Sequence, residues 1–449
     1  MVYTCPMSKQ FWSFLFVTLF MLTGCGLLAD DPPLFTVTPT LLIPSPVGTP
    51  IVPTPELGTS TPVVAATPTR IVLRLWTTEE ISPRSEVRGG AVLVEQLDVF
   101  ASSHPDLLLD VQLKAVSGQG GTLNYLRTGR TVAPSILPDV ILLQASQLAA
   151  ATQEGLIYPL DGLIPAEMVN DLYPAAANLS RVNNALMGYP FTITGLEHLA
   201  YNGGVITRTL PITWNAMINL PNADFVFPAA GMSGSRLILQ LYLAFGGTLT
   251  NEVNQPNLQV EPLTQALSLI SQGRQAGFIL LESDNFTTNS EAWQLYQSGL
   301  ANIVSTSPRN FLDNREFVPG SQYALLAGPN GPLIPLVDAW VWAVTTPDPA
   351  RQALAVELIN WLCSDATMGS WTAVGAQLPA RRSAFVFWTV ETPYQSFLQT
   401  QLELAQPYPA AATSSVITAL NNATFAVIDG SKPPEVAAQD AVMAVISSQ

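Results

Sequence analysis

The sequence predicts an α/β fold with a parallel sheet covered by helices on both faces. Strand-like and helix-like patterns alternate as β-α-β-α-β over about 75 residues from Ile71 onward. The chain has 449 residues, enough for two or three domains. Its residues are 48% hydrophobic, enough to fill large cores, so we expect the bulk of the chain to be folded.

The first elements follow from hydrophobic periodicity. A β-rich run at 71–76 precedes a helical pattern at 84–103, whose apolar stripe includes Val94, Leu97 and Phe100. Alternation then predicts a strand at 107–116, a helix at 121–130 and a buried strand at 139–143. Further helical patterns occur near 234–246, 262–276, 289–299, 349–363 and 393–406. Strand-like runs occur near 302–305, 323–326 and 339–345.

Charge excludes several partners. Charged residues make up 11% of the chain, and 18 Lys and Arg against 33 Asp and Glu give a net charge of −15. A nucleic-acid surface needs clustered cations that displace counterions, and attraction to anionic lipid needs the same sign of charge. We therefore expect neither nucleic acid nor a lipid surface bound by charge.

The N-terminus has the pattern of a signal peptide followed by a lipidation site. Lys9 precedes an apolar run at 11–22, which is too short to span a bilayer but suits the core of a signal peptide. The run ends in Leu22-Thr23-Gly24-Cys25, which resembles the bacterial lipobox. This predicts a signal peptide at 1–24 and lipidation of Cys25, which would anchor the chain to the outer face of the cytoplasmic membrane. A simple secretory signal with an incidental Cys is the alternative.

A tether is predicted between this anchor and the folded part, over 25–70. Residues 31–70 contain ten Pro and nine Thr. Such a segment favours extended polyproline conformations and does not form a core. Forty residues at about 3.1 Å each reach up to roughly 120 Å.

Cysteine and histidine give no sign of a metal site. Cysteines stand at 5, 25 and 363 and histidines at 104 and 198, without zinc-ligand spacing. We expect Cys363 to be a buried, inert thiol and His104 and His198 to be structural. No cofactor is expected, since the chain also lacks a phosphate loop and a Gly-x-Gly-x-x-Gly motif.

A series of short motifs runs along the folded part of the chain. In chain order they are Trp76, FASSHPD at 100–106, PDV at 138–140, EGLIYPLD at 154–161, GYP at 188–190, LAYN at 199–202, SGLA at 298–301, AGP at 327–329, DAW at 338–340 and LPARR at 378–382. The order of these motifs resembles the extracellular solute-binding proteins of carbohydrate ABC importers, the group typified by maltose-binding protein.

The resemblance implies a periplasmic-binding-protein-like fold, with two α/β lobes joined by three hinge crossings and a ligand cleft between them. It implies crossings near 189–194, 337–341 and 378–382. Lobe one would comprise 71–190 plus 340–378, and lobe two 195–336 plus 383–449. The lobes would close on a solute by hinge motion, and a monomer would deliver it to ABC permease subunits.

Candidate ligand contacts in lobe one follow the first strand, because ligands of parallel sheets lie beyond the carboxyl ends of strands. A sugar suits an aromatic platform with polar neighbours, which the segment Trp76, Thr77, Thr78 and Glu79 offers. The alternative is a core tryptophan beside solvated acids. Gln144 follows the buried strand in the same way.

The crossings supply a second set of candidates. Thr192 and Thr194 stand at the first crossing, although threonine also favours strands for its own reasons. Asp338 and Trp340 stand in an apolar run at the second crossing, where a carboxylate needs a partner or a ligand. A structural ion pair for Asp338 and core packing for Trp340 are the alternatives.

The sequence departs from the family pattern in two places. Sugar binders often carry an aromatic residue and an acid where this chain has LLQAS at 142–146, and a Trp soon after the segment that ends at Ser305. Here TSPR follows at 306–309, and Ser305 itself is a candidate ligand contact. Arg309 and Arg381 are candidates for binding a carboxylate or phosphate, with surface ion pairs as the alternative.

Three functions remain open at this point. The first is the binding protein of an importer for a sugar or oligosaccharide. The second is the same fold serving another solute or a sensor. The third is a surface enzyme acting on polysaccharide, since a glycosidase needs only two carboxylates. No spacing singles out a catalytic pair, so we expect no enzyme.

Overall fold

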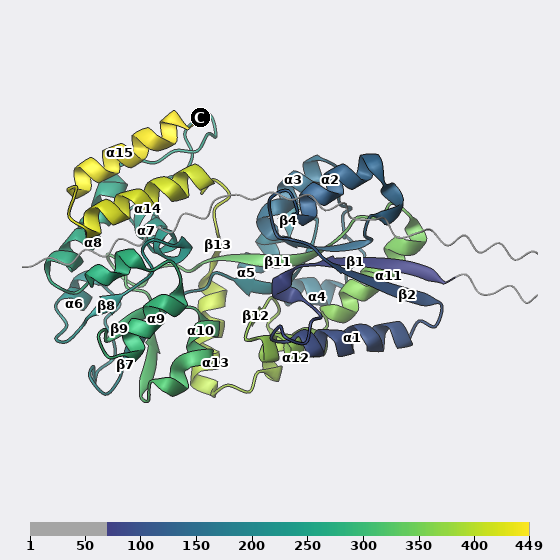
Figure 1. The fold of residues 1–449 in the computed structure, drawn as a ribbon, viewed down its shortest axis with the longest axis horizontal. Helices are drawn as coiled ribbons and strands as arrows, with labels where there is room; N and C mark the ends of the chain where they lie inside the picture. Colours follow the sequence, from purple (N-terminus) through teal and green to yellow (C-terminus); the bar gives the residue numbers. More distant parts are fainter. Residues whose placement is uncertain (1–69, 449) are drawn as a thin grey trace, which may run out of the picture. The chain divides into compact units, whose positions relative to one another are not determined.

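The computed structural model describes residues 70–448 (Figure 1). The predicted signal peptide, Cys25 and the tether up to residue 69 lie outside the described residues. No helix among the described residues is long and apolar enough to cross a bilayer.

The first sheet is mixed rather than fully parallel. Its strand order is β12-β6-β11-β3-β1-β2, and the short β13 pairs with β11. The bounds are β1 (Ile71–Thr77), β2 (Leu107–Leu113), β3 (Val140–Gln144), β6 (Tyr189–Thr194), β11 (Leu336–Val344), β12 (Leu378–Pro379) and β13 (Gln406–Pro407). The expected parallel pairing holds for β2-β1-β3, but β11 runs antiparallel to β3 and to β6. Strand β11 has this direction because the chain re-enters the sheet from the side of the second sheet.

The second sheet has the order β10-β7-β9-β8. Its strands are β7 (His198–Asn202), β8 (Phe225–Val226), β9 (Ile303–Thr306) and β10 (Ser321–Ala324). Strand β7 runs antiparallel to both neighbours, and β8 runs parallel to β9. We refer to the seven-stranded sheet and the helices against it as lobe one, and to the four-stranded sheet and its helices as lobe two. The predicted lobe boundaries stay predictions.

The helices belong to layers beside these sheets (Figure 1). Lobe one carries α1 (Gly90–Ser102), α2 (Thr122–Val132), α3 (Leu148–Gln153), α4 (Ala166–Asn170), α5 (Pro174–Leu179), α11 (Pro349–Leu362) and α12 (Asp365–Gly375), with a small hairpin of β4 (Arg181–Val182) and β5 (Ala185–Leu186). Lobe two carries α6 (Trp214–Ile218), α7 (Met232–Ala244), α8 (Val260–Gln275), α9 (Asn289–Gln297), α10 (Pro308–Asn314), α14 (Ser414–Ile428) and α15 (Pro434–Ser447). Helix α13 (Thr392–Leu404) contacts α5 of lobe one, and its Tyr394 packs on His198 of lobe two.

Short 3-10 turns complete the chain. They are η1 (Glu79–Ile81), η2 (Pro134–Ile136), η3 (Ala145–Gln147), η4 (Leu281–Asn285), η5 (Arg315–Phe317) and η6 (Ser383–Phe387).

Helix α1 begins six residues later than its hydrophobic pattern predicts. A Cβ on Gly90 would lie 1.8 Å from the carbonyl oxygen of Arg84, so the chain folds back on itself before the helix starts. Gly89 has φ +83°, a left-handed conformation that glycine adopts without a Cβ penalty. Residues 84–89 therefore form a non-helical turn instead of the first part of the predicted helix.

The hydrophobic core follows the two faces of the first sheet and the interior of lobe two. Leu75 and Trp342 contribute to the core on one face of the first sheet, and Trp76 and Ile141 to the core on the other. A third cluster fills lobe two between α7, α8 and α14. Burial of a large apolar side chain stabilises the fold by about 1.5–3 kcal/mol. These clusters therefore fix the positions of the strand ends from which the candidate site is built.

Candidate ligand-binding site

Five of the predicted residues come together at one edge of the first sheet. Gln144 lies opposite Trp340, and Trp340 lies opposite Thr192. In the next row Asp338 lies opposite Thr194. Residues far apart in sequence thus form two short rows, one across β3, β11 and β6 and one across β11 and β6, at the end of the sheet where β6 leads to lobe two and β11 returns from it.

The segment after β1 approaches the same edge. The indole Nε1 of Trp340 donates a hydrogen bond to Oε2 of Glu80 over 3.3 Å, which fixes this turn beside β11. Thr78 is fully buried and its Oγ1 has no hydrogen-bond partner, whereas Thr77 donates to the carbonyl of Ile81. Glu79 is exposed and forms an ion pair with Arg84 at 3.4 Å.

Two residues of these rows, Gln144 and Asp338, already accept hydrogen bonds within the protein. The Gln144 side chain accepts a hydrogen bond from the backbone N–H of Gln147 and so caps η3. Oδ1 of Asp338 accepts from its neighbour's backbone N–H, at Ala339, over 2.8 Å. Thr192 is different, since it is fully buried and its Oγ1 has no hydrogen-bond partner.

Trp76 lies in the core instead of on an open face. It is 3% exposed and belongs to the cluster beneath α2. Lys114 Nζ lies 4.5 Å from its ring centroid and Tyr125 packs edge-on against it. This is the core interpretation that the sequence left open beside the platform.

The two candidate arginines have protein partners. Arg381 is 8% exposed, its Nε donates to Asp171 over 2.9 Å, and its Nη1 donates to the carbonyl of Cys363. Arg309 is on α10, and its Nε lies 3.9 Å from a carboxylate oxygen of Asp313 one turn later. The Arg381 guanidinium cannot meet an anion without giving up a partner, whereas Arg309 is half-exposed and its one ion pair is long.

Lobe two contributes a buried carboxylate that the sequence-based prediction missed. Glu197 stands directly before β7, is 7% exposed, and its Oε2 has no hydrogen bond of good geometry. The predicted Ser305 lies on β9 opposite Leu199, and its Oγ is buried without a hydrogen-bond partner of good geometry. The signal that could have found Glu197 is an acid between Leu196 and His198, just after the first predicted crossing.

Burial and local charges oppose each other at Glu197. Burial raises the pKa of this carboxyl, and Arg236 is the largest influence that lowers it. Ser233 in the first turn of α7, Asn289 at the start of α9 and Ser305 favour the charged form as well. Asp338 shows the same balance, with burial raising its pKa and Ala339 N–H and Arg236 lowering it.

The unpartnered polar atoms indicate the chemistry that this edge accepts. Thr78 and Thr192 offer buried hydroxyls without a partner, and in lobe two the Ser305 hydroxyl interacts with the Glu197 carboxyl; each hydroxyl can donate and accept. A buried polar group without a partner costs about 1–3 kcal/mol. A ligand with several hydroxyls would remove this cost, because it can donate to a carboxylate and exchange hydrogen bonds with hydroxyls.

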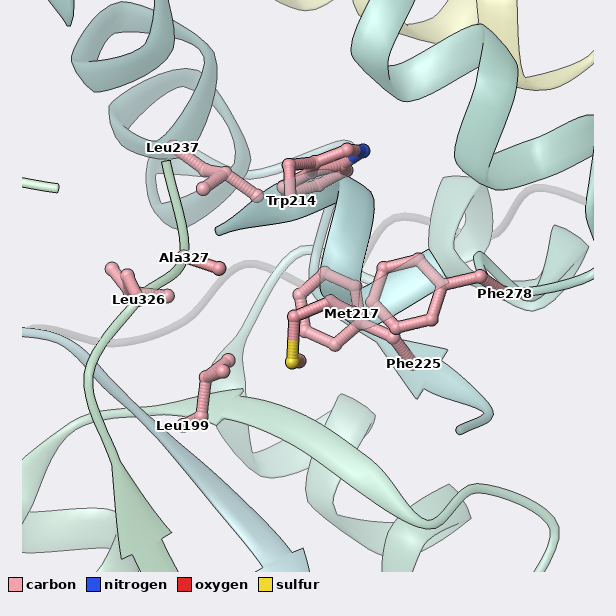
Figure 2. A pocket seen from close by; sticks show the side chains of 8 residues that line it. All are labelled: Leu199, Trp214, Met217, Phe225, Leu237, Phe278, Leu326 and Ala327. Atoms are coloured by element: carbon pink, nitrogen blue, oxygen red, sulfur yellow. The ribbon is translucent and has the colours of Figure 1, made fainter. Parts of the chain in front are cut away.

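An apolar cavity elsewhere in lobe two is not part of this site. Figure 2 shows its lining, with side chains from β7, β8 and α6 that carry no charge. Its volume is about 10 Å³, enough for one water at most, and no polar group converges on it. The lining residues are Leu199, Trp214, Met217, Phe225, Leu237, Phe278, Leu326 and Ala327.

A resident metal has no ligand set among the described residues, since residues 70–448 contain no group of three or more His, Cys, Asp or Glu placed to hold one. Cys363 is fully buried, as predicted, and burial raises the pKa of its thiol.

The family model for bacterial extracellular solute-binding proteins matches residues 119–392, more than half of the chain. The chain belongs to this family. A comparison of this solute-binding protein with curated proteins found no match.

Several solved structures share the fold of this solute-binding protein. Maltose-bound MalE3 of T. maritima has a TM-score of 0.65 at 17% identity, covering 84% of this chain and 100% of that chain. The sugar-binding protein MalE of Xanthomonas citri has a TM-score of 0.67 at 18% identity, covering 84% and 98%. A family 1 solute-binding protein of Alicyclobacillus acidocaldarius has a TM-score of 0.67 at 14% identity, covering 85% and 99%. At these identities the likeness shows the fold, which is the predicted periplasmic-binding-protein-like one.

Proposed function

We propose that this protein is the substrate-binding lipoprotein of an ABC importer, and that it captures a sugar or oligosaccharide by closing its lobes and delivers it to a membrane permease. The observation that carries the proposal is the pair of buried hydroxyls without a hydrogen-bond partner at this end of the first sheet, those of Thr78 and Thr192. Solved proteins of the same fold are described as bound to maltose or as sugar-binding, which supports a carbohydrate.

A neutral ligand fits the site better than an anionic one. Arg381 is held by Asp171 and the carbonyl of Cys363, and Arg309 is paired within α10. The buried carboxyl group of Glu197 would repel an anion. The same fold serving a non-sugar solute or a sensor therefore remains the second candidate, with a neutral solute preferred.

A ligand screen tests this function on the full chain carrying Cys25→Ser, which prevents lipidation. At 100 times the dissociation constant a ligand stabilises the fold by about 2.7 kcal/mol, a thermal shift of several degrees. We expect a shift with maltose, maltotriose or another sugar, and none with amino acids, polyamines or phosphorylated compounds. A shift with an anionic solute alone would overturn the carbohydrate assignment.

Two variants locate the site. Thr192→Val and Glu197→Gln change buried groups with little change of shape, so we expect a weaker sugar shift with a folded protein. Glu252→Gln, on an exposed loop residue of lobe two, is the matched control and should keep the full shift. Sugar recovered intact after incubation agrees with a binding protein, whereas cleaved sugar would favour the enzyme.

The anchor is a separate part of the proposal. It rests on the lipobox-like Leu22-Thr23-Gly24-Cys25 after an apolar run. We expect the full chain to sediment with membranes and the Cys25→Ser chain to appear in the soluble fraction. A Cys25→Ser chain that stays with the membrane would overturn lipid anchoring at this residue.

A further inference from the structure

Arg236 lies where all three passages between the lobes meet. It extends from α7 and is 9% exposed. Its Nη1 donates to the carbonyl oxygen of Leu336 over 2.6 Å, and its guanidinium lies 4.6 Å from the ring centroid of Tyr408. A Cβ on Gly195 would approach the same guanidinium to 2.6 Å.

These three partners belong to three different connections. Gly195 follows β6 and precedes β7, on the first passage from lobe one to lobe two. Leu336 opens β11, on the return passage. Tyr408 follows β13 on the third passage, by which we mean the segment between α13 and α14 and not the predicted crossing at 378–382. Its backbone N–H donates to the carbonyl of Val337 over 2.7 Å. One side chain of lobe two therefore contacts each of the three segments that join the lobes.

The surrounding charges hold the guanidinium without a direct ion pair. The charge of Arg236 lowers the pKa of Glu197, which precedes β7, and of Asp338 on β11. No carboxylate among residues 70–448 lies within ion-pair distance of it. Its position is therefore set by the Leu336 carbonyl, the Tyr408 ring and the space over Gly195.

Gly195 is the residue that makes this arrangement possible. Its φ is +80°, which disfavours any side chain with a Cβ. The open space above it is filled by the guanidinium of Arg236. A change at either residue thus alters the first passage directly.

We propose that Arg236 is a positioning residue for ligand capture, which ties the three passages together and thereby sets the angle between the lobes. This rests on the proposed function only for its effect on affinity. A residue without ligand contact changes affinity if it changes the population of the binding-competent arrangement. Couplings of this kind typically alter dissociation constants by about 2- to 30-fold.

The test compares Arg236→Met with Arg274→Met by small-angle X-ray scattering of the ligand-free protein. Arg274 is the matched control, since its Nε donates to a backbone carbonyl, that of Ile428, within lobe two and away from the passages. We expect a changed distance distribution for Arg236→Met alone. Arg236→Lys should restore part of it, because a lysine can still donate to Leu336.

Affinity is the second measurement, on whichever sugar the thermal screen identifies. We expect the dissociation constant to change about 2- to 30-fold for Arg236→Met and not for Arg274→Met. Unchanged scattering and affinity together with a lower melting temperature would overturn the proposal, since they indicate a purely structural role.

Two further outcomes are covered: an Arg236→Met chain that does not fold, and a screen in which no sugar binds. If Arg236→Met does not fold, Tyr408→Leu removes only the ring on the third passage and should change the same scattering profile in the same direction. An unchanged profile for Tyr408→Leu would then overturn the proposal. If no sugar binds, the proposed function fails, while the ligand-free scattering still decides the role of Arg236.

Discussion

His198 shows how burial controls a titratable residue in this fold. Its Nε2 lies 2.9 Å from the hydroxyl of Tyr394 and its Nδ1 lies 3.0 Å from the carbonyl of Leu199. Burial lowers the pKa of His198 to about 4, and the contact with the Leu199 carbonyl only partly offsets this. His104 behaves in the opposite way, because a hydrogen bond to the backbone of Phe100 and the nearby Glu357 raise its pKa. Both histidines are structural, as predicted.

A pH titration checks this difference. An unfolded histidine gains a proton near pH 6.5, whereas His198 in the fold does so near pH 4. The fold is therefore more stable above pH 6.5, and this stabilisation of about 3 kcal/mol is lost as the pH falls from 6.5 toward 4.

The measurement is an NMR titration of the two imidazoles together with urea unfolding at several pH values. We expect His104 to titrate above pH 6.5 and His198→Asn to flatten the acid limb of stability. His104→Asn is the control and should keep that limb. A His198 signal that titrates near its ordinary pKa contradicts the prediction.

Individual site residues divide according to the environment that the fold gives them. Trp76 and Arg381 carry the right chemistry for a ligand, yet one is packed under α2 and the other is paired with Asp171. Thr192 and Glu197 are both buried, but the Thr192 hydroxyl has no hydrogen-bond partner, whereas the Glu197 carboxyl interacts with Arg236 and nearby polar side chains. Residue type predicts what a side chain can do, and only its neighbours decide whether it is free to do it.

At the scale of elements, helix α11 shows how strongly local sequence can specify a boundary. Asp348 caps it, since Oδ1 accepts from the backbone N–H groups of Ala350 and Arg351 over 2.9 and 3.0 Å. Pro349 occupies the first turn, where no N–H is needed. The helix predicted at 349–363 from its periodicity agrees with α11 to within a residue.

Loss of this cap should destabilise the protein measurably. Asp348→Ala leaves two N–H groups without their side-chain acceptor, and we expect a loss of about 1 kcal/mol in the free energy of unfolding. Urea unfolding followed by circular dichroism is the measurement. Asp98→Ala, on the exposed middle of α1, is the control and should change stability little. Equal losses in the two variants would show that the cap contributes nothing specific.

Helices α12, α14 and α15 were not predicted from the sequence. Their apolar residues are not confined to one narrow stripe, because α14 is packed by α15, α7 and α8 together. Gly369 and Gly375 interrupt the pattern of α12, where a Cβ on Gly369 would lie 2.4 Å from the ring of Phe387. Burial on several sides removes the periodicity on which the prediction depends.

At the scale of the whole folded part, an ion pair connects the two lobes in addition to the three passages. Arg88 of lobe one pairs with Asp313 on α10 of lobe two, and Arg309 lies on the other side of that carboxylate. Nε of Arg88 also donates to the carbonyl of Val374 over 2.6 Å, which holds it against α12. Both side chains of the pair are partly exposed, so salt will screen it.

Removal of this pair should favour separation of the lobes. Exposed ion pairs contribute about 0.2–1 kcal/mol, so Asp313→Asn should shift the balance between arrangements by up to roughly fivefold at low salt, and less at high salt. Small-angle scattering of the ligand-free protein at two salt concentrations measures it. Asp440→Asn, whose partner Lys432 lies in the same lobe, is the control. A salt-independent effect, or an equal effect in the control, contradicts the prediction.

The sequence by itself determined the α/β class, most long helices and strands, the family resemblance and five residues that meet at the edge of the first sheet. These follow from local periodicity and motif order, which need no long-range contact. The tertiary structure alone decided the antiparallel direction of β11, the burial of Trp76, the partners of Arg381, and the meeting of Glu197, Arg236 and Asp338. These depend on segments about 40 to 210 residues apart. No local pattern records such distances, because burial and pairing arise only when the chain has folded.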